Sequence, residues 1–244
     1  MERTKRNLII AILVLFALNL TGSEKKDIYD AYINNAMSVW KKIIDQLELK
    51  TEKNSQQQLE LVNYQYGYIA CCFSHNHKDE AVVYLKLAED HIRLLEMNKF
   101  ELSKTNAYKS AFYGYHIGLN VFSAPFIGSK SAACAKLSVA IDPNDYFGYI
   151  QLGNVRLHAP SFMGGSKPEA LKNFLKARAL MERDGLDRSD DWNYLSLLIS
   201  IAKTYEILNE ANSAKLTYEE ILKFEPKFKW VKDELYPQLL KKIK

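Results

Sequence analysis

The sequence predicts an all-α fold, an α-α superhelix of helical hairpins with further helices at both ends. Two observations predict it. The 244 residues include only ten Gly and six Pro against fifteen Tyr and eleven Phe, which suits long helices packed through bulky side chains better than a turn-rich β-sandwich. In addition, the helical hairpin predicted over residues 149–179 recurs in weaker form on both sides of itself, and such self-similarity is typical of repeat proteins.

The hairpin over residues 149–179 contains small residues at positions where helices would have to approach closely. Gly153 lies in its first predicted helix, and its second contains Ala170-x3-Phe174-x2-Ala177. A small Ala permits close packing of two helices, and the aromatic side chain one turn later fills the gap beside them. Because a lone hairpin cannot bury both of its faces, we expect neighbouring hairpins to stack on it.

Three more hairpins match this pattern. They are Tyr66-Gly67 with Ala81-x3-Leu85-x2-Ala88, Ile117-Gly118 with Ala133-x3-Leu137-x2-Ala140, and Ile201-Ala202 with Ala214-x3-Tyr218-x2-Ile221. Over roughly residues 60–228 the pattern resembles the tetratricopeptide repeat (TPR) family, whose signature pairs Leu-Gly-x2-Tyr in one helix with Ala-x3-Phe in the next. The resemblance implies one TPR-like domain over residues 24–244, with about four degenerate repeats and with Ala133, Ala170 and Ala214 at close helix crossings.

The two middle hairpins have related loops. One is Ala159-Pro160-x-Phe162-x-Gly164-Gly165-Ser166-Lys167, and the other is Ala124-Pro125-Phe126-x-Gly128-Ser129-Lys130. Such loops are similar to those of a subset of exported bacterial TPR proteins, and that subset resembles the TPR proteins associated with some TRAP-type solute transporters.

The Gly-Gly-Ser-Lys run in the first of these loops predicts the start of a helix. Ser166 is a good N-cap, Glu169 would complete a capping box, and Pro168 stands in the first turn, where its missing N–H costs little. The alternative is an anion held at the helix N-terminus, or a contact with a partner. The run is not a phosphate-binding Walker A loop, because the required spacing of Gly, Lys and Ser/Thr is absent.

The remaining segments predict additional helices. Residues 28–49 show apolar side chains at three- and four-residue steps, which indicates one amphipathic helix. Ser55 to Gln58 resembles a capping box that opens the next helix, and Ser189 is the expected cap of a helix near Trp192. Residues 230–243 predict a final helix that covers the last repeat through Val231, Leu235, Leu239 and Ile243.

Residues 1–23 predict a secretory signal peptide. Arg3, Lys5 and Arg6 precede an unbroken apolar run over residues 8–18, and small residues follow at Gly22 and Ser23. The run is shorter than the roughly 20 residues that a spanning helix needs, so an uncleaved membrane anchor is the second interpretation. We therefore expect a periplasmic or secreted protein, with membrane contact only through this segment if it is retained.

Composition and motifs predict no catalytic, metal or cofactor site. The formal net charge of +4 arises from 33 basic and 29 acidic residues, a near balance that predicts no nucleic-acid partner. The chain has one basic cluster, at its C-terminus, and because Glu225, Asp233 and Glu234 interrupt it, it predicts a solvated face: Lys227, Lys229, Lys232, Lys241, Lys242 and Lys244. His75 and His77 form a short pair without further ligands and predict a solvated turn. Cys71, Cys72 and Cys134 lie in apolar helical contexts typical of buried thiols, although a disulfide from Cys134 to one of the pair stays open.

The resemblance to TPR proteins also implies where a partner would bind. In this fold the first helices of successive repeats line a concave groove. The predicted groove residues are Tyr64, Tyr68, Phe112, Tyr115, Leu119, Phe147, Ile150, Asn154 and Lys203. The set is aromatic and has little charge, which disfavours a clamp for acidic peptide tails. The alternative is that these aromatic side chains belong to the core.

Two functions follow as hypotheses. The first is a non-catalytic protein–protein interaction scaffold or adaptor, whose partner is another protein or a peptide contacted through Tyr and Phe anchors. The second is an accessory component of solute uptake, which binds a small apolar ligand or docks on a substrate-binding protein. An open groove would favour the scaffold, whereas an enclosed apolar pocket of about 300 Å3 or more would favour the ligand carrier.

Overall fold

A computed structural model describes residues 24–243, and the predicted signal peptide at residues 1–23 lies outside them. Residues 24–33 form a first helical segment. The elements that follow are α2 (Met37–Glu48), α3 (Ser55–Ser74), α4 (Lys78–Met97), α5 (Leu102–Leu119), η1 (Val121–Ser123), α6 (Ala124–Ile141), α7 (Tyr146–His158), η2 (Ser161–Met163), α8 (Lys167–Arg183), η3 (Leu186–Arg188), α9 (Trp192–Ile207), α10 (Ala211–Phe224), η4 (Trp230–Leu235) and α11 (Tyr236–Lys242). Over the described residues the fold is all-α, as predicted.

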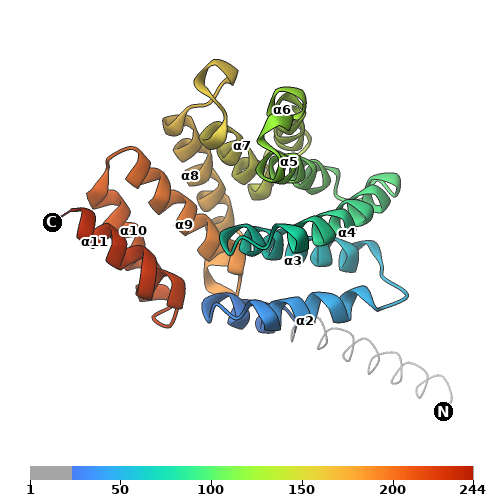
Figure 1. The fold of residues 1–244 in the computed structure, drawn as a ribbon, viewed down its shortest axis with the longest axis horizontal. Helices are drawn as coiled ribbons and strands as arrows, with labels where there is room; N and C mark the ends of the chain where they lie inside the picture. Colours follow the sequence, from blue (N-terminus) through green and yellow to red (C-terminus); the bar gives the residue numbers. More distant parts are fainter. Residues whose placement is uncertain (1–23, 244) are drawn as a thin grey trace, which may run out of the picture.

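Consecutive helices pack as four hairpins, α3 with α4, α5 with α6, α7 with α8 and α9 with α10. Each hairpin packs on the next through α4 and α5, α6 and α7, or α8 and α9. Figure 1 shows these pairs following one another around a curve, with α2 beneath α3 and with α11 beside α10 at the other end. The helical-repeat superhelix predicted from the sequence is therefore confirmed.

The small residues of three hairpins lie where the pattern predicts. Ala81, Ala170 and Ala214 are fully buried. In the third hairpin the two helices of the pair touch so closely that a side chain added at Gly153 would collide with the ring of Phe174. Close helix crossings at small residues, each beside a larger apolar side chain, thus hold these hairpins together.

The second hairpin departs from the prediction. Ala133, Leu137 and Ala140 of α6 are exposed, so Ala133 does not lie at a close helix crossing. The buried positions, two residues earlier in each case, are Ser131, Ala135 and Ser138. Helix α6 is apolar around most of its circumference, so its sequence pattern does not determine which face turns inward.

Serine hydroxyls determine the face of α6 that packs on α5. Ser131 Oγ donates a hydrogen bond to the backbone oxygen of Ser110 at 2.8 Å, and Ser103 Oγ donates to the backbone oxygen of Ser138 at 2.9 Å. All four serines are buried. Buried hydroxyl groups need such partners, and the small serine side chains leave room for the two helices to approach each other.

The helix predicted over residues 28–49 is two helices instead of one. The first ends at residue 33 and α2 starts at Met37, with Asn35 between them in the left-handed conformation at φ 54°. Asn is one of the residue types that adopt this conformation at low cost. The break redirects the chain, so that Ile28 of the first segment and Trp40 of α2 are both buried in the same core.

The C-terminal helix is interrupted as well. Residues Trp230–Leu235 form a π-helix, and α11 follows with Pro237 in its first turn. Because proline has no N–H to donate to a preceding carbonyl, the helix widens before it. Val231, Leu235 and Leu239 are buried as predicted, whereas Ile243 is exposed.

Helix caps are confirmed in one place and shifted in two. Ser166 accepts a hydrogen bond from the backbone N–H of Glu169 at 3.4 Å, which confirms it as the N-cap of α8. The capping box of α3 pairs Asn54 with Gln57 and not Ser55 with Gln58. The cap of α9 is Asp191 and not Ser189, since Asp191 Oδ1 accepts the N–H of Asn193 at 2.8 Å.

Within residues 24–243, no helix combines the length and the apolar character that a bilayer-spanning segment requires.

The register of α6 can be tested with two matched substitutions. Ala135→Leu inserts a larger side chain at a fully buried position and should lower the free energy of unfolding by about 1–3 kcal/mol. Ala133→Leu, at an exposed position of the same helix, should change it by no more than about 0.5 kcal/mol. Urea denaturation followed by circular dichroism measures both, and a larger loss for Ala133→Leu would contradict the observed register.

Candidate partner-binding cleft

The predicted groove residues fall into two groups. Five side chains are buried: Tyr64, Tyr68, Phe112, Phe147 and Ile150. Four are partly exposed: Tyr115, Leu119, Asn154 and Lys203. The buried group contributes to the hydrophobic core, so in this conformation it offers no surface to a partner.

The inside of the curve is occupied by the protein's own aromatic rings. Tyr66 of α3 contacts rings from the first helices of the other three hairpins, with centroid distances of 5.6 Å to Tyr115, 5.4 Å to Phe147 and 6.2 Å to Trp192. The hydroxyl of Tyr115 donates to the backbone oxygen of Tyr66 at 2.9 Å. The first helices therefore pack on one another, where a regular TPR superhelix would leave a groove.

Polar side chains reinforce this closure between the first and last hairpins. Asn63 of α3 donates through Nδ2 to Asn193 Oδ1 of α9 at 3.1 Å and to the hydroxyl of Tyr108 of α5 at 2.9 Å. Its Oδ1 accepts from Trp192 Nε1 at 3.1 Å. One amide thus connects three helices and satisfies the indole N–H of a buried tryptophan.

An open cleft of about 210 Å3 lies beside α3, and its lining includes Trp192, which also contacts Tyr66 in the closed interior. We call it the aromatic cleft. The first helical segment, α2, α3, α9 and η4 form its walls. It is lined by Ala31, Tyr32, Asn35, Ala36, Met37, Trp40, Gly67, Ala70, Cys71, Ser74, His75, Trp192, Ser196, Trp230 and Glu234.

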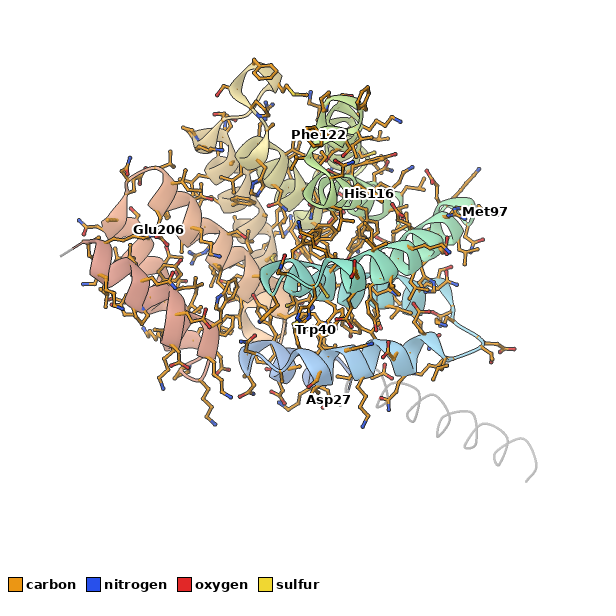
Figure 2. All side chains as sticks on the ribbon, viewed as in Figure 1. Asp27, Trp40, Met97, His116, Phe122 and Glu206 are labelled. Atoms are coloured by element: carbon orange, nitrogen blue, oxygen red, sulfur yellow. The ribbon has the colours of Figure 1, made fainter. Side chains whose placement is uncertain are left out.

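Three aromatic rings around Gly67 form the floor of the aromatic cleft. Trp40 and Trp192 pack edge to face with centroids 5.2 Å apart, and Tyr32 lies 5.9 Å from Trp40 and 5.8 Å from Trp192. Trp40 Nε1 donates to the backbone oxygen of Tyr64 at 3.0 Å, which fixes this indole between α2 and α3 (Figure 2). Since both indoles have hydrogen-bond partners, the floor is apolar and rigid.

The rim of the cleft is polar and accessible. Asn35, Ser74, His75 and Glu234 are exposed, and Ser196 is half-buried. An apolar centre within a polar rim is the usual arrangement of a protein–protein contact site.

One predicted groove residue, Lys203, lies next to this rim. Its ammonium group stands 4.4 Å from the centroid of the Trp230 ring, a cation–π contact. Burial lowers the pKa of Lys203. The contact positions the half-buried Trp230 side chain at the edge of the cleft.

Cys71 in the cleft is not equipped for thiol chemistry. Burial raises the pKa of its thiol to about 11, so at neutral pH the group is protonated and a poor nucleophile or metal ligand. The backbone oxygen of Cys71 accepts hydrogen bonds from Ser74 Oγ at 2.8 Å and from His75 Nδ1 at 2.9 Å, which places the ring proton of His75 on Nδ1. Cys71, Cys72 and Cys134 are all free thiols.

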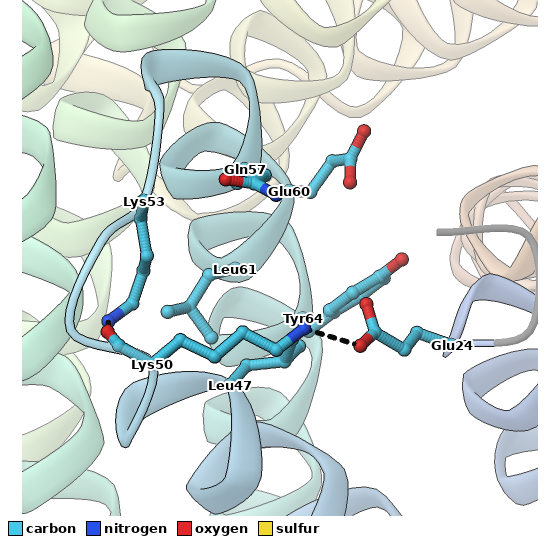
Figure 3. Close-up of a pocket in the computed structure, with 8 residues that line it drawn as sticks. All are labelled: Glu24, Leu47, Lys50, Lys53, Gln57, Glu60, Leu61 and Tyr64. Carbon is cyan, nitrogen blue, oxygen red and sulfur yellow. Dashed lines mark hydrogen bonds and ion pairs between the residues drawn. The ribbon is translucent and has the colours of Figure 1, made fainter. Parts of the chain in front are cut away.

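A second, much smaller pocket lies between α2 and α3 (Figure 3) and includes the predicted groove residue Tyr64. Its volume of about 20 Å3 holds about one water molecule. Lys50 spans it and pairs with Glu24 at 2.7 Å. A dimple of this size, closed by an ion pair, has no room for a ligand.

No group of three or more His, Cys, Asp or Glu side chains that could hold a metal ion occurs among residues 24–243. His75 is exposed in the turn between α3 and α4, where the sequence places a solvated turn, with Asn76 at φ 60°.

Of the residues that shape the interior and the cleft, the sequence pattern predicts Trp40 only as an apolar position of the helix over residues 28–49, and Trp192 only as the start of a helix. It gives no role to Asn63. Tyr66-Gly67 was identified only as a repeat marker. Two features of the sequence point to this packing. Gly67 stands in the middle of a long helix, and the chain has only three tryptophans. A glycine inside a helix often marks a close approach by another group, which here is the pair of indoles.

Gly67→Ala tests this packing. The added Cβ would lie 2.6 Å from Trp40 Cζ2 and 2.7 Å from Trp192 Cη2, so both indoles must move, and we expect a loss of about 1–3 kcal/mol in the free energy of unfolding. Gly114→Ala, inside α5 and with open space around it, is the control and should stabilise by up to about 1 kcal/mol. Urea denaturation monitored by tryptophan fluorescence measures both; equal effects would contradict the packing at Gly67.

Comparison with known proteins identifies the fold. No protein-family model matches the sequence, and neither does any curated protein. Among solved structures, the chain is similar to the crystal structure of a thermophilic TPR protein from Thermus thermophilus. The TM-score is 0.53 at 14% sequence identity, over 96% of this chain and 98% of that chain.

The similarity extends over nearly the full length of both proteins, although the sequences have diverged far. The chain accordingly has the helical-repeat fold of TPR proteins.

Proposed function

We propose that this chain is an exported, non-catalytic protein-interaction scaffold that holds a protein or peptide partner at the aromatic cleft. TPR-like stacks typically present surfaces to other proteins. The observation that supports the proposal most is the cleft itself. It opens to solvent within a polar rim, exposes part of the Tyr32 and Trp230 rings, and is backed by the buried indoles of Trp40 and Trp192. Tyrosine and tryptophan are the residue types on which interface binding energy is usually concentrated.

The size of the cleft favours a protein partner over a small-molecule ligand. Pockets that enclose a ligand are usually about 300–1,000 Å3 in volume and bury most of its surface. The aromatic cleft is smaller, at about 210 Å3, and is open on one side. It suits the insertion of one or two apolar side chains from a larger molecule.

An accessory role in solute uptake is the second candidate. The two middle loops, which resemble those of TPR proteins associated with TRAP-type transporters, motivate it. In that role the same cleft would dock a substrate-binding protein. Because the cleft is small, docking on a substrate-binding protein is favoured over binding of an apolar ligand.

Export is part of the proposal and rests on residues 1–23. Their basic start, apolar run and small residues are typical of a signal peptide. The proposal places the mature chain in the periplasm or outside the cell, with residues 1–23 as its attachment to the membrane if they are retained.

A photoreactive benzoylphenylalanine at position 70 tests the proposed site. Ala70 is exposed and lines the cleft, so a bound partner would lie within reach of the probe. Irradiation of cells that naturally make this protein should produce one discrete adduct of higher mass, detectable on a gel with an antibody against the chain. Mass spectrometry of that adduct identifies the partner.

The same probe at position 179 is the matched control, because Ala179 is also an exposed helical alanine and does not line the cleft. We expect no discrete adduct there. Adducts of equal yield from both positions, or none from position 70, would refute binding at the cleft. A substrate-binding protein in the position-70 adduct would favour the second candidate.

A further inference from the structure

The outward face of α6 is largely apolar and also carries the exposed Ser129 and Lys130. Phe126, Ala133, Leu137, Ala140 and Ile141 are all exposed. At about 100° per residue they share one side of the helix, opposite the buried serine positions that face α5. A helix that is apolar on both sides is expected to be covered on both.

Two neighbouring turns extend this apolar surface. Phe122 in η1 is 83% exposed, and Phe162 in η2 is 89% exposed. Both turns adjoin α6: η1 directly precedes it in the chain, and a side chain added at Gly128 of α6 would stand 3.7 Å from Met163 Cε of η2. Figure 1 shows α6 and the α7–α8 loop at the same edge of the molecule, and Figure 2 shows Phe122 at its surface. We call this surface the phenylalanine face: Phe122, Phe126, Phe162, Met163, Ala133, Leu137, Ala140 and Ile141.

The fold itself does not require these exposed rings. The first and last hairpins turn through three residues each, His75–His77 and Leu208–Glu210. Each of these turns has an asparagine in the left-handed conformation, Asn76 at φ 60° and Asn209 at φ 61°. The two middle hairpins instead have longer connections that present phenylalanine to solvent, at a cost in hydration of apolar surface.

The two segments that form the phenylalanine face carry charge of one sign. No Asp or Glu occurs in residues 119–141 or in residues 146–168, and the exposed Asp142 and Glu169 follow directly at their ends. Both segments contain basic residues. Lys130 and Lys136 on α6 are exposed, and Arg156 donates a hydrogen bond to the backbone oxygen of Gly164 in the α7–α8 loop.

We propose that the phenylalanine face docks on the surface of an anionic lipid bilayer. Phenylalanine side chains on protruding turns can enter the boundary between head groups and acyl chains, while lysines beside them contact anionic head groups. A groove would be expected if this face received a helix or peptide. The rings of Phe122, Phe126 and Phe162 are instead largely exposed and stand out from the surface.

Such docking would bring the scaffold to a membrane independently of residues 1–23. It would leave the aromatic cleft free, because none of the cleft residues belongs to the phenylalanine face. Failure of this inference would therefore leave the proposed function untouched, and the reverse also holds.

Local fluorescence quenching tests the proposal on the full chain. In Phe162→Trp, the new indole should lose fluorescence on addition of vesicles that contain brominated phosphatidylcholine and phosphatidylglycerol, because bromine atoms quench only indoles that reach the acyl region. The wild-type chain gives the baseline, since two of its three tryptophans, Trp40 and Trp192, are buried. The readout is local and separates insertion of this face from binding through residues 1–23.

Leu216→Trp is the matched control, as Leu216 is 66% exposed on α10 and lies outside the phenylalanine face. Its quenching should remain at the wild-type level. Neutral vesicles, or the added changes Lys130→Gln and Lys136→Gln, should reduce the quenching of Phe162→Trp. Circular dichroism confirms that each variant is folded. Equal quenching of Phe162→Trp and Leu216→Trp, or equal quenching by neutral and anionic vesicles, would overturn the proposal, as would no quenching at all.

Discussion

The close approach of two indole rings at Gly67 is the contact on which the arrangement of the hairpins depends. Trp40 belongs to α2 and Trp192 to α9, far apart in the sequence, and both occupy the space that a side chain at position 67 would fill. Burial of large aromatic side chains in edge-to-face contact contributes several kcal/mol in total, on the order of 1.5–3 kcal/mol each from area and about 0.5–1.5 kcal/mol from ring geometry. This contact connects the start of the stack to its last hairpin.

The closure has a consequence for where a partner could bind. A solenoid whose repeats touch only their neighbours leaves its first helices free to line a groove. Here Tyr66 contacts rings on α5, α7 and α9, and Asn63 connects α3 to α5 and α9. Two of the surfaces that remain accessible are the aromatic cleft beside α3 and the phenylalanine face along α6. They differ in chemistry, since the first is concave with a polar rim and the second protrudes and has basic residues beside it.

The successes and failures of the sequence pattern have physical reasons. Ala170 and Ala214 lie where predicted because their helices have one apolar side, so periodicity determines which face packs inward. Helix α6 can turn either of two sides inward, and the Ala133 pattern selects the side that faces solvent in the structure. The caps of α3 and α9 lie one or two residues from the predicted serines, because Asn54 accepts the N–H of Gln57 and Asp191 that of Asn193. Asn and Asp are among the preferred N-cap residues.

By itself, the sequence determined the all-α class, the number and order of the hairpins, and the cap of α8 at Ser166. Each of these depends on residues close together in the chain. Only the tertiary structure decided that the predicted groove residues Tyr64, Tyr68 and Phe147 are buried, and that Trp40 and Trp192 meet across Gly67. Such contacts depend on how far the stack curves, and the curvature results from packing summed over every hairpin, which no local spacing of residues encodes.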